Sequence, residues 1–228
     1  MKRILSILAV VALVAMTVQA VEVKSENVAG VINVSVEAAK YKLVGVTLDD
    51  MDALNPTLAD VLGTDGVPDG TVVYFYTGSG YEGHTYYADE PSGWFTDDDE
   101  LSSAVVDRVT GFWVYCPQNY TFSLTGEVPD YDTPVILDNG YQIANYPFPA
   151  AKGLADTAIG QNAADGDVIY VLDSEGNYVG QTYYVDEPAG WFLDDDSESD
   201  LVFNPGDSFW YYRVGTSTSY DETVPYTL

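Results

Sequence analysis

The chain is poor in the residues that bind nucleic acid or build disulfide frameworks. Only 8 of its 228 residues are Lys or Arg, against 36 Asp and Glu, so the formal net charge is −28. Phosphate backbones are bound by clustered Lys and Arg, which excludes nucleic acid as a partner. The single cysteine, Cys116, cannot form an internal disulfide and lies in an apolar run, which predicts an inert core thiol.

Histidine and long apolar runs are also scarce. The one histidine, His84, lies in no nucleophile motif, so we expect it at the surface and expect no enzyme. Apolar residues dominate Ile4 to Met16, after Lys2-Arg3 and before the small residues of a cleavage site. This pattern predicts a signal peptide over residues 1–20, since the run is too short to span a membrane. We therefore expect a secreted protein of the cell surface, extracellular space or periplasm, with no membrane insertion.

A domain-sized internal repeat is the main positive feature. The segment Thr85 to Asp99 returns 97 residues later as Thr182 to Asp196, with 12 of 15 positions identical and no gap. A period this long indicates two modules that each close a core, rather than a solenoid of short repeats. We expect residues 21–128 to form module 1, residues 129–134 a short linker, and residues 135–228 module 2.

Strand patterns outnumber helix patterns in both modules. Strict apolar and polar alternation at 32–37 and 120–125 is typical of strands with one wet face, whereas 72–76 and 168–172 are apolar on both faces and predict central strands. One short helix per module is indicated by 55–63 and, more weakly, by 153–160. The sequence therefore predicts an all-β protein of two tandem duplicated β-sandwich or barrel-like modules, each with one short helix.

Several turn and core motifs resemble a known group of proteins. The stretches 41–46, 60–63, 68–74, 111–115 and 124–128 are similar to those of a loose, largely uncharacterised family of exported bacterial β-repeat proteins. Modules of that family end in a Gly-x-Gly-Phe-Trp-Val type strand. The resemblance implies a secreted, β-rich surface or extracellular protein, and it supplies no catalytic residues.

Runs of aspartate follow the Gly-Trp-Phe element in both modules. A turn could gather their carboxylates around Ca²⁺, which takes six to eight oxygen ligands, although the spacing does not match an EF-hand. The alternative is a solvated acidic loop that keeps the protein soluble. The candidate metal ligands are Asp97, Asp98, Asp99, Asp194, Asp195 and Asp196.

The four tryptophans occupy repeat-equivalent positions. Trp113 and Trp210 lie in strand-like runs, so we expect them in the core. Trp94 and Trp191 follow a Pro-x-Gly turn beside acidic residues, where they are either core residues or a platform on which a sugar could stack. These alternatives lead to two functional hypotheses.

The favoured hypothesis is a secreted, non-enzymatic structural or adhesive protein. It would associate with copies of itself or with other surface proteins, and its charge repulsion would have to be screened by salt or bridged by divalent ions. The rival hypothesis is a carbohydrate-binding module protein that binds glycans through Trp94 and Trp191, with or without a dependence on Ca²⁺.

Overall fold

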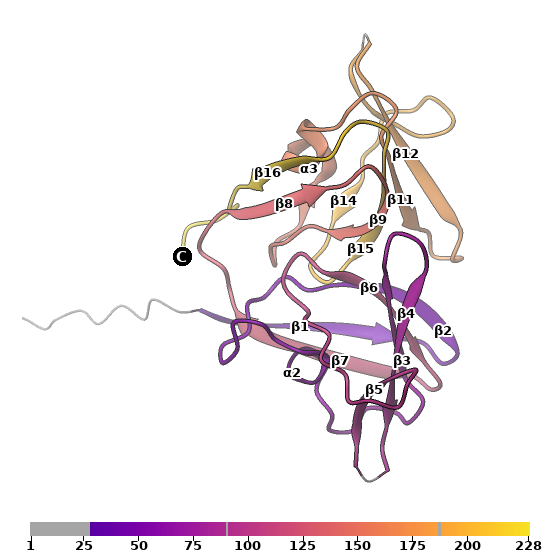
Figure 1. The fold of residues 1–228 in the computed structure, drawn as a ribbon. Coiled ribbons are helices and arrows are strands. Elements are labelled where there is room, and N and C mark those ends of the chain that lie inside the picture. The colour runs from indigo at the N-terminus through magenta and orange to yellow at the C-terminus, as the bar shows by residue number, and fades with distance from the viewer. Residues whose placement is uncertain (1–27, 90, 187) are drawn as a thin grey trace, which may run out of the picture.

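The computed structural model describes residues 28–89, 91–186 and 188–228. It is built almost entirely of antiparallel strands, in two modules that follow one another along the chain and lie one above the other in Figure 1. This confirms the all-β, two-module prediction. The predicted signal peptide at 1–20 lies outside the described residues.

Module 1 combines a five-stranded sheet with a two-stranded ribbon. The sheet order is β2-β6-β3-β4-β5, the ribbon pairs β1 with β7, and all pairings are antiparallel. One short helix, α2, lies in the connection before β3. The elements are β1 (Ala29–Val36), β2 (Lys40–Gly45), α2 (Leu58–Leu62), β3 (Val72–Tyr76), β4 (Tyr81–Tyr87), β5 (Gly93–Thr96), β6 (Gly111–Cys116) and β7 (Tyr120–Glu127).

Module 2 repeats this topology. Its sheet order is β9-β15-β11-β12-β13, its ribbon pairs β8 with β16, and a small additional pair joins β10 to β14. A 3₁₀ turn, η1, followed by the short helix α3 takes the place of α2. The elements are β8 (Thr133–Leu137), β9 (Gly140–Asn145), β10 (Lys152–Gly153), η1 (Leu154–Asp156), α3 (Ala158–Gln161), β11 (Val168–Leu172), β12 (Tyr178–Tyr184), β13 (Gly190–Phe192), β14 (Val202–Phe203), β15 (Ser208–Arg213) and β16 (Thr218–Glu222).

Each core lies between the ribbon and the inner face of the sheet. In module 1 the alternating side chains Phe112, Val114 and Cys116 of β6 point inward, where they join Phe122 and Leu124 of β7. The strands β3 and β11, predicted to be central, are the third of five in their sheets. Because a sheet with one covered face presents its other residues outward, the opposite face of β6 carries Trp113 and Tyr115.

The two modules are joined by more than their linker. β8 already begins at Thr133, so the last two residues of the predicted linker belong to module 2. The Gly45 amide donates to the carbonyl of Gly206 at 3.0 Å, and the Asn145 side-chain amide donates to the carbonyls of Val46 and Arg108, each at 2.9 Å. These bonds hold the two five-stranded sheets edge to edge.

Candidate functional site

Trp94 and Trp191 are core residues. Their side chains are only 2% and 4% exposed, and each joins the apolar cluster of its module. The Trp94 indole N–H donates to the carbonyl of Gly63 at 3.0 Å, and that of Trp191 to Gly160 at 3.1 Å. In both modules the indole thus satisfies a carbonyl at the end of the short helix. The structure leaves neither ring available as a sugar-stacking platform, so these two residues are not carbohydrate candidates.

Trp113 and Trp210, expected in the core, lie on the other side of their sheets. Neither belongs to the apolar cluster of its module, whereas their neighbours Phe112 and Phe209 do. Trp113 is half-buried, while Trp210 is 8% exposed because other aromatic rings surround it. Trp210 is buried as expected, although outside the apolar cluster of its module, whereas the core prediction was wrong for Trp113. Period-2 alternation puts Trp and its neighbouring Phe on opposite faces of a strand but does not say which face is covered.

Each of these tryptophans lines an open hollow made of aromatic side chains. The module 1 hollow, of about 490 Å³, is lined by Tyr41, Tyr74, Tyr81 and Trp113. The module 2 hollow, of about 380 Å³, is lined by Tyr141, Tyr170, Tyr178 and Trp210, together with Tyr76 from module 1. We call the two hollows together the aromatic face.

The two hollows are built from the same strand positions. Tyr74 pairs with Trp113 and with Gly83 in module 1, as Tyr170 pairs with Trp210 and with Gly180 in module 2. A Cβ on either glycine would lie 3.4 or 3.3 Å from the ring of the facing tyrosine, so the missing side chain lets that ring lie across the strand.

The equivalent ring pairs of the two modules have the same geometry, as their strands have the same register. The Tyr41 and Trp113 centroids are 6.4 Å apart with an interplanar angle of 87°, and the equivalent Tyr141 and Trp210 give 6.2 Å and 84°. Tyr74 and Tyr81 give 6.4 Å and 83°, and their equivalents Tyr170 and Tyr178 give 6.4 Å and 82°. Rings near right angles make the walls of a hollow rather than one flat shelf.

The hollows meet at the junction of the modules. Trp210 lies 4.8 Å from the ring of Tyr76 and 6.5 Å from that of Tyr81, so module 1 supplies part of the wall of the module 2 hollow. The outer tyrosines of both hollows remain about half exposed, with Tyr41, Tyr81, Tyr141 and Tyr178 between 50% and 56%. The aromatic face is therefore continuous across both modules and open to solvent.

One aspartate of each predicted run lies beside a hollow. The partly buried position of the Tyr74 phenol, the neighbouring Tyr41 and the charge of Asp97 all raise the pKa of Tyr74. Burial, Tyr141 and the charge of Asp194 raise the pKa of Tyr170 in the same way. Both phenols therefore stay protonated at neutral pH and keep an O–H that can donate a hydrogen bond.

The aspartate runs themselves form tight hairpin turns. The Asp99 amide donates to the carbonyl of Thr96 at 3.0 Å, and that of Asp196 to Leu193 at 3.0 Å. Asp99 and Asp196 have φ angles of 60° and 63°, a left-handed conformation that Asp tolerates better than most residues. Within the described residues, no group of three or more His, Cys, Asp and Glu side chains is placed to hold a metal ion, and Ca²⁺ binding stays a prediction.

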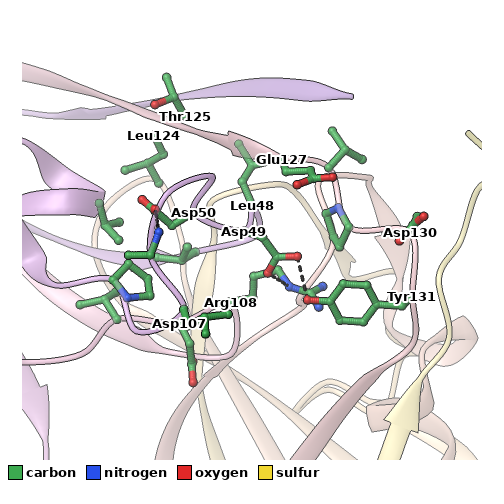
Figure 2. Close-up of a pocket in the computed structure, with 18 residues that line it drawn as sticks. Leu48, Asp49, Asp50, Asp107, Arg108, Leu124, Thr125, Glu127, Asp130 and Tyr131 are labelled. Carbon is green, nitrogen blue, oxygen red and sulfur yellow. Dashed lines mark hydrogen bonds and ion pairs between the residues drawn. The ribbon is translucent and has the colours of Figure 1, made fainter. Parts of the chain in front are cut away.

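A further pocket, of about 290 Å³, lies at the module junction (Figure 2). Its one guanidinium, Arg108, is 6% exposed and pairs with Asp49 through Nε at 2.6 Å. Tyr131 donates its O–H to the other oxygen of Asp49 at 2.9 Å, and its ring lies 4.6 Å from the guanidinium carbon. Arg108 and Asp49 satisfy one another here, and the Tyr131 hydrogen bond to Asp49 ties the linker to module 1.

His84 and Cys116 are both buried. His84, expected at the surface, is a residue of β4 whose side chain is 1% exposed on the covered face of the sheet, and this burial lowers its pKa. The surface prediction was wrong because the absence of a nucleophile motif says nothing about burial, and strand alternation turns His84 inward against Phe75. Cys116 is fully buried as predicted, and burial raises the pKa of its thiol.

Scans against protein-family models, curated proteins and solved structures find no match for this chain. Within the part of the chain that the structure describes, no helix is long and apolar enough to cross a membrane. The aromatic face is therefore interpreted from its own geometry.

Proposed function

We propose that this protein is an exported, non-enzymatic binding protein that holds a carbohydrate on its aromatic face. The observation that carries the proposal is that the same four outward-facing aromatic positions, with the same geometry, occur in both modules, and that two tyrosines of each set are about half exposed. Folding requires buried residues to be apolar or paired, but it does not require outward-facing tyrosines to persist through divergence of a duplicated module. Their retention favours a role in binding.

The chemistry of the hollows suits a sugar ring. The C–H face of a pyranose is apolar and packs on aromatic rings, while its hydroxyls need hydrogen-bond partners around the edge. Tyrosine supplies both an apolar ring and a polar tip, and exposed Tyr and Trp are typical of recognition surfaces. Binding pockets combine such apolar walls with a few polar groups, which Asp97 and Asp194 supply here.

Self-association is the second candidate, because a continuous apolar surface can also bury itself against another copy. Charge opposes it. The formal net charge of −28 becomes −30 if the predicted leader with its two positive charges is removed, and two such copies repel each other at ordinary salt. An exported glycan-binding protein would also account for the adhesive role expected from the sequence, without contact between copies.

A glycan-binding screen with matched variants tests the proposal. We expect Trp113→Ala and Trp210→Ala each to weaken glycan binding at least about tenfold, the effect of losing about 1.4 kcal/mol. Tyr87→Ala and Tyr184→Ala are the controls, since these tyrosines are 43% and 46% exposed and repeat-equivalent but line neither hollow. They should bind as the parent does.

Light scattering of the same variants separates the two candidates. A parent protein that stays monomeric from low to high salt and binds a glycan supports the proposal. A parent that assembles, binds no glycan, and becomes monomeric on Trp210→Ala would replace the proposal with self-association.

A further inference from the structure

We infer that the ligand is a linear polysaccharide carrying free amino groups, and that one chain of it spans both hollows. This inference rests on the proposed function and specifies the class of glycan. It is argued from the charge around the aromatic face, the orientation of the rings and the contact between the hollows.

Charge around the hollows favours a cationic ligand. Asp97 lies close enough to the module 1 hollow that its Oδ1 would be 3.4 Å from a Cβ on Gly83, the same place that faces the Tyr74 ring. Asp194 is its repeat equivalent beside Tyr170. Among the described residues, no Lys or Arg lines either hollow. A polymer of uronic acids would therefore meet repulsion, whereas ammonium groups would meet carboxylates.

Ring orientation adds a second attraction for ammonium groups. The near-perpendicular pairs Tyr41 with Trp113 and Tyr74 with Tyr81 turn ring faces as well as edges toward the space between them. Cations are attracted to the electron-rich faces of Trp and Tyr within about 6 Å of the ring centroid. An amino sugar can therefore pack its C–H face on one ring while its ammonium group lies near another ring and an aspartate.

Contact between the hollows favours a polymer over a single sugar. Tyr81 lines the module 1 hollow and lies 6.5 Å from Trp210, which lines the module 2 hollow. The junction is held by the bond from Gly45 to Gly206 and by Asn145, so the hollows keep a fixed spacing. A chain bound in one hollow then meets the second at high effective concentration, which strengthens binding without new contacts.

Calorimetric titration of the full-length exported protein tests this with four hexamers: glucosamine, N-acetylglucosamine, galacturonic acid and lysine. We expect the glucosamine hexamer to bind most tightly, to weaken as salt rises, and to bind more than about tenfold more tightly than the glucosamine dimer. Galacturonate should not bind. Lysine should bind more weakly, because it lacks a sugar ring to pack on the aromatic walls.

Paired charge variants localise the effect. Asp97→Asn and Asp194→Asn should each weaken glucosamine binding several-fold and leave N-acetylglucosamine binding unchanged. Asp98→Asn and Asp195→Asn, the next residues in the same turns, remove the same charge and should have a smaller effect.

Four outcomes would overturn the inference: equal or tighter binding of the acetylated hexamer, no salt dependence, equal effects of Asp97→Asn and Asp98→Asn, or lysine binding as tight as glucosamine. In each of these cases the proposed function survives if Trp113→Ala still abolishes binding of some glycan. If no hexamer and no screened glycan binds, the proposed function fails together with the inference.

Discussion

The two modules keep the same four outward aromatic residues but differ at some buried positions. Three tyrosines and one tryptophan occupy the same positions of the aromatic face in both modules. The residues that precede the central strands β3 and β11, and the buried residues beside them, differ in chemistry. Module 1 has Thr71 beside the fully buried thiol of Cys116. Module 2 has Asp167 at the position of Thr71, with Arg213 at the position of Cys116.

The charged version in module 2 is fully satisfied. Asp167 is completely buried, pairs with Arg213 Nη1 at 2.8 Å and accepts the Tyr211 O–H at 2.7 Å. Backbone amides of Ala164 and Val214 donate to it at 2.8 Å each. A protein core can contain either the Thr and Cys pair or the Asp and Arg pair, as long as its buried polar groups are hydrogen-bonded. Folding does not require the outward-facing aromatic residues to be kept. The outward aromatic residues are retained although these neighbouring inner positions have diverged, which supports the proposed binding role of the aromatic face.

The largest expected difference between the modules follows from removing this buried charge. Asp167→Ala leaves Arg213 buried without its partner and should lower the free energy of unfolding by about 4 kcal/mol. Thr71→Val at the equivalent place in module 1 removes one hydroxyl and should cost about 1 kcal/mol. Urea unfolding followed by tryptophan fluorescence measures both, and similar losses in the two variants would contradict the assigned difference.

The second prediction separates inner from outer tryptophans. Trp94→Ala empties part of the module 1 core and should lower the free energy of unfolding by about 3 kcal/mol, with Trp191→Ala similar. Trp113→Ala, on the open side of the same sheet, should cost about 1 kcal/mol and act mainly on ligand binding. Thermal melts run beside the glycan titrations check this. A larger loss of stability in Trp113→Ala than in Trp94→Ala would reverse the two roles.

The third prediction concerns the module junction, where repeat-equivalent residues face each other. A Cβ on Gly111 would collide with Ser208 Oγ and lie 2.6 Å from Ile143. Gly111→Ser should therefore destabilise the protein by about 2 kcal/mol through overpacking. Adding Ser208→Gly exchanges the two residues and should restore at least about 0.5 kcal/mol. Strictly additive effects would mean that these positions do not touch.

The smallest effect is the pH dependence that His84 contributes in module 1, where module 2 has the non-titrating Gln181. Burial lowers the pKa of His84 below its ordinary value of 6.5, against an opposing contribution from Glu82. The unfolded chain then binds a proton first, so the stability from neutral His84 is full above pH 6.5 and is lost as pH falls toward the folded pKa. His84→Gln, which copies Gln181 of module 2, should lose less stability between pH 7.5 and 5.5 than the parent. Parallel curves for the two proteins would exclude this role.

Much of the fold could be predicted because its signals are local. The duplication, the all-β class, the two central strands and the short helix before β3 all follow from spacing, alternation and turn residues within a few positions. The Tyr86 and Tyr87 pair shows the same logic, since adjacent strand residues face opposite ways and the structure leaves them 4% and 43% exposed.

Tertiary structure alone decided which aromatics are exposed and which of them meet. Alternation separates Phe112 from Trp113 but cannot say which side the ribbon covers, and the bond from Trp94 to Gly63 joins residues 31 positions apart. The module 1 hollow needs Tyr41, Tyr74 and Tyr81 from three strands whose order and register the sequence does not state. Side-chain period is a property of one strand, whereas a surface belongs to the whole sheet, and only the packed sheet brings these residues together.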